Sequence, residues 1–172
     1  RVAFGERGAT RLQHPYRLEH FLMARTAEIS RETKETQIKL TVAVDGTGSI
    51  EAKTGIGFFD HMLTHIAKHG LFDLVVDAKG DLEIDAHHTV EDVGICLGKA
   101  FAQALGEMKG IARFGHAVVP MDEALAEVAV DFSGRPFLVF EAELPRGKVG
   151  DFDSELTEEF FRAFAVNSRT TL

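Results

Sequence analysis

The alternation of apolar and polar positions predicts an ordered domain that begins near residue 25. Residues 36–45 alternate polar and apolar side chains with a period of two, which is typical of a strand with one buried face. The glycines within residues 46–48 indicate a turn, and residues 49–53 predict a second strand. Residues 1–24 show little periodicity and are rich in arginine, so we expect a non-native or disordered N-terminal extension outside the fold.

Residues 58–69 predict a helix, because their apolar side chains recur at the spacing of one helical face. His61, His65 and His69 recur every four residues and share the opposite face of this helix. Gly70 follows at the position where many helices end in a left-handed residue. The sequence therefore predicts a helix that presents a row of imidazoles and ends at Gly70.

The remaining pattern continues as strands and helices. A strand over 71–79 and a short strand over 82–85 are followed by a second predicted helix over about 88–105. The later part of the chain predicts three strands, a helix that Ser154 can cap and the start of another strand, at 117–119, 124–132, 137–144, 154–168 and 170–172.

The order of these elements repeats within the chain. Each half runs from strands to a helix with a Phe-Phe pair, at 58–59 and again at 160–161, and then to an apolar strand. We predict an α+β fold with a first half over 25–109 and a second half over 110–172. The first half closes with a helix, whereas the second has none, so we expect the second half to be truncated at the C-terminus.

Composition and charge exclude several classes of function. The chain has 172 residues, 45% of them hydrophobic, which is enough for one domain with an apolar core. A formal net charge of −8 argues against nucleic acid as a partner. No apolar run approaches the roughly 20 residues of a membrane span, and no secretory signal is expected. The lone Cys96 lies in an apolar helical pattern, which predicts a buried structural thiol and a cytoplasmic protein.

The candidate chemistry centres on the start of the second predicted helix, where two adjacent histidines precede a glutamate. In a helix, His87 and Glu91 lie one turn apart on one face, and His88 is also a neighbour of Glu91. The two histidines point about 100° apart, so they reach two ions, or one ion and a substrate, more easily than they chelate one. Imidazole with carboxylate suits Mn, Fe or Zn. Taken alone, the motif is equally open to interpretation as a capped helix start with solvated histidines.

Six separated motifs occur along the chain, at residues 54–63, 69–70, 85–92, 113–115, 120–125 and 131–136. Together, and in this order, they make the chain resemble the imidazoleglycerol-phosphate dehydratases of histidine biosynthesis. The resemblance covers about residues 25–172, and the family's second His-His-x-x-Glu motif is absent from this sequence.

The resemblance implies a duplicated α+β fold in which each half is a four-stranded sheet with helices packed on one face, the second half lacking its final helix. It implies two Mn2+ ions per site, bound where subunits meet in trimers that assemble into a larger cage. It also implies dehydration of imidazole glycerol phosphate, a small phosphorylated imidazole, to imidazole acetol phosphate by a lyase without redox or organic cofactor. The alternatives are an inactive or metal-poor assembly form of the same family and a different metal enzyme on the same fold.

The same resemblance assigns roles to individual residues. The expected metal ligands are His61, His87, His88 and Glu91, with Glu159 standing where the family often has a histidine. Glu35 and Glu91 are the expected proton-transfer groups. The expected substrate-binding set is Glu35, His61, His65, His69, His87, His88, Glu91, Arg113 and Arg135.

Several of these assignments have plain alternatives. The guanidinium forks of Arg113 and Arg135 suit a phosphate, but each is also explained by a surface pair or a turn. His65 stands where the family commonly has glutamine, so an exposed helical histidine is its alternative. Glu35 on an edge strand is equally a candidate for a solvent-facing side chain.

Overall fold

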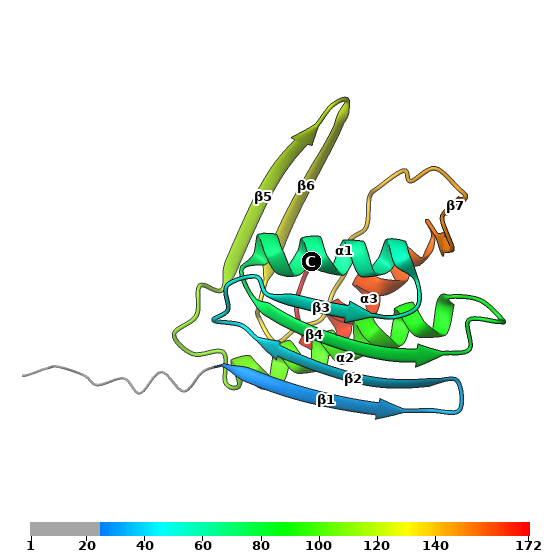
Figure 1. Ribbon diagram of the computed structural model, residues 1–172. Coiled ribbons are helices and arrows are strands. Elements are labelled where there is room, and N and C mark those ends of the chain that lie inside the picture. The colour runs from blue at the N-terminus through cyan, green and yellow to red at the C-terminus, as the bar shows by residue number, and fades with distance from the viewer. Residues whose placement is uncertain (1–24) are drawn as a thin grey trace, which may run out of the picture.

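The computed structural model describes residues 25–172, so the predicted extension over 1–24 lies outside the described residues. The first half forms a four-stranded sheet with helices packed against one face (Figure 1). Its strands occur in the spatial order β1-β2-β4-β3, with antiparallel pairs except for β3, which runs parallel to β4. They are β1 (Thr26–Glu32), β2 (Thr36–Ala43), β3 (Ile50–Lys53) and β4 (Asp73–Gly80). The predicted α+β class is confirmed.

The period-two pattern of β2 explains where the core lies. Ile38, Leu40 and Val42 are buried, and the residues between them are exposed or half-buried. In β4, Leu74 and Val76 are buried on the same side of the sheet. These side chains pack with the apolar faces of α1 (Gly57–Gly70) and α2 (His87–Leu105), which leaves the other face of the sheet to solvent.

Two glycines set the contact between α2 and α3 (Leu156–Ser168). A Cβ on Gly94 would lie 2.8 Å from the carbonyl oxygen of Phe160, and one on Gly98 would lie 2.6 Å from that of Phe164. Only a residue without a side chain permits this approach. Gly98 follows Gly94 by four residues, and its neighbour Phe164 follows Phe160 by four residues as well. The two helices therefore run in the same direction, and both begin at the same end of their contact.

The end of α1 differs from the prediction. The left-handed residue is Leu71, with φ of 56°, rather than Gly70. Gly70 is instead required to be small, because a Cβ there would lie 2.6 Å from the ring of Phe72. The chain reverses one residue later than expected so that Phe72 can fold back into the core, where it is buried.

Two further local predictions are wrong. Residues 82–85 form a turn rather than a strand, closed by a hydrogen bond from the Ile84 amide to the Asp81 carbonyl oxygen at 2.8 Å. Ser154 does not cap α3, because its hydroxyl donates to the carbonyl oxygen of Pro145 at 2.7 Å and Glu155 occupies the N-cap position. Both differences arise from contacts between segments that the local pattern does not contain.

The second half contains less regular sheet than expected. β5 (Phe114–Met121) and β6 (Ala124–Asp131) form a hairpin that projects from the body of the domain (Figure 1). The strand predicted over 137–144 is reduced to an isolated bridge at Phe137, and two short strands, β7 (Lys148–Val149) and β8 (Phe152–Asp153), were not predicted. The regular sheet of this half is therefore the two-stranded pair of β5 and β6, extended by the isolated bridges at Thr171.

The pairing around Thr171 nevertheless follows the first half. Thr171 bridges Asp131 of β6 in antiparallel orientation and Phe137 in parallel orientation. In the first sheet, β4 pairs in the same two senses with β2 and β3. The same two pairing senses therefore occur around Thr171 and around β4.

Two findings bear on the predictions made from composition. None of the helices within 25–172 is long and apolar enough to cross a membrane. Cys96 is fully buried in α2, and this burial raises the pKa of its thiol to about 11. The prediction of a structural rather than a nucleophilic cysteine is therefore confirmed.

Candidate active site

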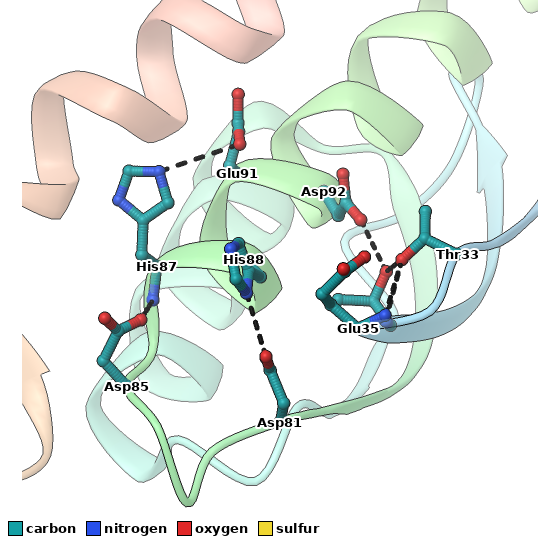
Figure 2. A network of polar contacts seen from close by, with 9 residues as sticks. Thr33, Glu35, Asp81, Asp85, His87, His88, Glu91 and Asp92 are labelled. Carbon is teal, nitrogen blue, oxygen red and sulfur yellow. Dashed lines mark hydrogen bonds and ion pairs between the residues drawn. The ribbon is translucent and has the colours of Figure 1, made fainter.

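The start of α2 carries the histidine pair, and the preceding turn supports it (Figure 2). Asp85 accepts a hydrogen bond from the backbone N–H of His87 at 2.7 Å. This contact satisfies one of the amide groups that a helix start leaves without a partner, and it places a negative charge at the positive end of the helix dipole. The contact therefore helps to define where the helix begins.

His87 and Glu91 lie on one face of α2, as predicted. Nε2 of His87 is 3.7 Å from a carboxylate oxygen of Glu91, and both side chains are about half-exposed. The rings of His87 and His88 are 5.9 Å apart between centroids, with planes at 89°. The two ring planes are therefore nearly perpendicular, in keeping with side chains that point about 100° apart at adjacent helical positions.

His88 is held by a carboxylate that lies outside the predicted set of site residues. The Nδ1 atom of His88 lies 3.0 and 3.2 Å from the two carboxylate oxygens of Asp81, at the end of β4 (Figure 2). The hydrogen bond to Asp81 raises the pKa of His88. Because the carboxylate accepts from Nδ1, the Nε2 atom of a neutral ring keeps its lone pair for an external partner.

Glu35 is brought to the same region by the turn between β1 and β2. The hydroxyl of Thr33 accepts hydrogen bonds from the amides of Glu35 and Thr36, at 3.1 and 2.9 Å. The charge of Glu35 is close enough to His88 to contribute to raising the pKa of that imidazole. Glu35 and His88 thus lie in the same region of one chain.

A buried carboxylate fastens this turn to α2. Asp92 accepts from Nε of Arg31 at 2.8 Å and from the hydroxyl of Thr36. Arg31 lies on the inner face of β1, in register with the buried Ala27, so its charge requires a partner there. Asp92, only 6% exposed, supplies that partner and links the strand that precedes Glu35 to the helix that carries His88.

The row of histidines on α1 forms a second group. His61, His65 and His69 are exposed, as predicted. Nε2 of His61 is 3.0 Å from Nε2 of His65, and Nδ1 of His65 is 3.4 Å from Nε2 of His69. Within residues 25–172, no hydrogen bond or ion pair joins this row to the start of α2.

The two arginines lie at the base of the hairpin. Arg113 makes a two-pronged ion pair with Asp131, at 2.5 and 2.9 Å, and its guanidinium lies 4.9 Å from the ring centre of Phe114. The hydrogen bond from Arg113, with a smaller contribution from the charge of Arg135, lowers the pKa of Asp131. Asp131 contacts Nε and one terminal nitrogen of Arg113, and the other terminal nitrogen is not used by this pair.

Glu159 lies in the first turn of α3, half-buried. The parallel course of α2 and α3 places this turn at the same end of the helix pair as the start of α2. In the described part of the chain, no group of three or more histidine, cysteine, aspartate or glutamate side chains converges as a metal site. One chain therefore presents the predicted ligands as separate small groups.

Comparisons with known proteins agree with this architecture. The chain is 60% identical over 149 residues to the imidazoleglycerol-phosphate dehydratase of Gluconacetobacter diazotrophicus, covering 87% of this chain and 75% of that protein. It is 63% identical over 150 residues to the imidazoleglycerol-phosphate dehydratase of Acetivibrio thermocellus. This match covers 87% of this chain and 77% of that protein. The crystal structure of the Staphylococcus aureus enzyme superposes with a TM-score of 0.75 at 40% identity, over 85% of this chain and 80% of that one. The crystal structure of the Pyrococcus furiosus enzyme superposes with a TM-score of 0.71 at 36% sequence identity. This match covers 83% of this chain and 76% of that one.

The fold and the site therefore define the chain as a dehydratase, a lyase that removes water from its substrate. The family model described as imidazoleglycerol-phosphate dehydratase matches residues 54–172. The chain belongs to the imidazoleglycerol-phosphate dehydratase family.

Proposed function

We propose that this dehydratase converts imidazole glycerol phosphate to imidazole acetol phosphate in histidine biosynthesis. One observation of the site carries the proposal: α2 presents His87, His88 and Glu91 at the surface, and His88 is held through Nδ1 so that Nε2 faces outward. Such an array suits a reaction that must bind an imidazole ring and move protons beside it. The name shared by the relatives at 60% and 63% identity supports the choice of substrate.

The side chains available at this site carry the kinds of atom that bind manganese. Imidazole nitrogens and carboxylate oxygens are both ligands that Mn2+ accepts, and a carboxylate behind a ligating imidazole is a common support. We propose two Mn2+ ions per site, with ligands from His61, His87, His88, Glu91 and Glu159. Bound manganese supplies Lewis-acid assistance to the loss of hydroxide. Because no three such donors converge within residues 25–172, we propose that more than one copy of the chain contributes to each site.

The other side chains bind the substrate and move its protons. Glu35 or Glu91 takes the carbon-bound proton beside the imidazole ring, and a protonated group assists the departing hydroxide. Arg113 and Arg135 bind the phosphate, for which a planar guanidinium is well suited, and Asp131 orients Arg113. His65 and His69 contact the substrate from the same helical face as His61.

We propose that the copies that share ligands assemble into trimers and then into a cage. Exposed apolar side chains on the hairpin, among them Val119, Met121 and Leu125, support self-association, because such patches mark protein contacts. We propose a cytoplasmic enzyme that binds neither nucleic acid nor membranes, in keeping with its net charge of −8 and its lone buried cysteine.

Turnover and metal content, measured on the same preparation of the full chain, test the proposal. We expect manganese-dependent release of imidazole acetol phosphate, bound manganese in the purified protein and less bound manganese in His88→Ala. Bound metal without dehydration of this substrate would refute the proposed reaction. Trimers that have neither metal nor activity would instead establish the assembly form considered as the alternative.

A further inference from the structure

Asp81 meets His88 with both carboxylate oxygens on one ring nitrogen. The oxygens lie 3.0 and 3.2 Å from Nδ1. The side chain of Asp81 is 13% exposed, whereas that of His88 is 43% exposed. An ionised carboxylate can only accept hydrogen bonds, so the proton between the two residues belongs to Nδ1. In a neutral ring the proton on Nδ1 therefore leaves Nε2, the nitrogen that Asp81 does not contact, as the acceptor.

The backbone that carries Asp81 is held against the same helix. A Cβ on Gly80 would lie 1.9 Å from the hydroxyl oxygen of Thr89, so the end of β4 packs directly on the first turn of α2. The Thr89 side chain is fully buried, and among the described residues its hydroxyl has no hydrogen-bond partner. This close packing allows little movement between β4 and α2. The hydrogen bond from the Ile84 amide to the Asp81 carbonyl holds the other side of the residue.

We infer that Asp81 is a positioning residue that fixes the Nδ1-protonated tautomer and the ring direction of His88, so that Nε2 is ready to bind a divalent cation. The inference rests on the proposed function, because it takes His88 as a metal ligand. A hydrogen-bonded carboxylate behind a ligating histidine increases the donor strength of the ring, and its loss typically reduces metal affinity by about 10–100-fold.

Asp85 provides a matched control. It is a second aspartate near His88, but its carboxylate accepts from the backbone amide of His87 at 2.7 Å instead of from an imidazole. Asp81→Asn and Asp85→Asn each remove one negative charge near the same ring. Only the first removes the acceptor-only group on Nδ1, since an amide can either accept from that nitrogen or donate to it.

Two measurements on the 172-residue chain test the inference. The first is the nitrogen NMR shifts of the His88 ring without metal, assigned by their absence in His88→Gln. We expect the wild type and Asp85→Asn to show Nδ1 protonated, and Asp81→Asn to show a mixture of tautomers. The second is Mn2+ affinity, measured by the loss of the free-ion EPR signal, which should fall about 10–100-fold in Asp81→Asn and less than threefold in Asp85→Asn.

The outcomes separate this inference from the proposed function. If Asp81→Asn keeps the wild-type tautomer, or if both variants lose Mn2+ affinity equally, Asp81 does not position His88. If the wild-type chain binds no Mn2+ while the tautomer still depends on Asp81, the manganese proposal fails and the positioning of the ring stands. Circular dichroism should show unchanged helix content in both variants. A loss of helix content in Asp81→Asn would instead indicate that Asp81 only supports the fold.

Discussion

Gly98 of α2 lies so close to Phe164 of α3 that a Cβ on the glycine would be 2.6 Å from the carbonyl oxygen of the phenylalanine. The same Cβ would lie 2.8 Å from the backbone nitrogen of Ser168. Both neighbours are main-chain atoms, which cannot rotate out of the way. The two helices therefore meet backbone to backbone, and this contact aligns the turn that holds Glu159 with the start of α2.

Gly98→Ala should destabilise the fold. Forcing an extra carbon into a packed core typically costs about 1–3 kcal/mol, and this exceeds the roughly 1 kcal/mol that alanine gains over glycine in a helix. Thermal unfolding followed by circular dichroism measures the change. Gly57→Ala is the matched control, because nothing lies within 4 Å of a Cβ at that helical position. Its melting temperature should be unchanged or higher, and an equal loss in both variants would contradict the packing explanation.

Asp92→Ala should be destabilising and should also impair catalysis. It leaves the buried hydroxyl of Thr36 without its acceptor, which typically costs about 1–3 kcal/mol, and it releases Arg31 from its partner. The turn that carries Glu35 would then lose its attachment to α2, so kcat should fall more than KM rises. Denaturant unfolding and steady-state kinetics measure the two effects.

The control for Asp92 is a pair at the surface. Lys39 and Glu28 form an ion pair at 3.1 Å in which both side chains are more than half exposed. Glu28→Ala should change the free energy of unfolding by less than about 1 kcal/mol, because exposed pairs are solvated and screened. Equal effects at Glu28 and Asp92 would contradict a special role for the buried carboxylate.

The features that could be predicted from the sequence are those that depend on local periodicity. The alternation in β2 and the apolar stripes of α1 and α2 located the core, because one buried face imposes its period on neighbouring residues. The contact between His88 and Asp81 was missed, because it depends on how closely the end of β4 approaches α2. The bond between Asp92 and Arg31 joins positions 61 residues apart, and no local pattern encodes such a distance. Gly80 offers the one signal for this approach, since a glycine at a strand end marks close contact with another backbone.

Cys96 should be inert in the folded protein. Its side chain is fully buried, and burial raises the pKa of the thiol to about 11, so almost no thiolate is present near neutral pH. Ellman's reagent at pH 8 should react with Cys96 only after denaturant is added. Stability should also decrease as pH rises above the value for an unfolded thiol, near 9, because the unfolded chain then loses a proton that the folded chain retains. Rapid labelling of the native protein would contradict this account.

Asp131 should make stability depend on pH in the acidic range. Its hydrogen bond with Arg113 lowers its pKa, so the folded chain holds this proton less tightly than the unfolded chain does. The contribution of the pair is therefore present above the unfolded pKa, near 4, and is lost as pH falls through the lower folded value. Thermal unfolding of the wild type and Asp131→Asn at several pH values measures it. The wild type should be the more stable protein at pH 7, by a small margin because the pair is exposed, and the difference should vanish towards pH 2. A difference that is constant over this range would show that Asp131 acts through its shape or its contacts rather than through its charge.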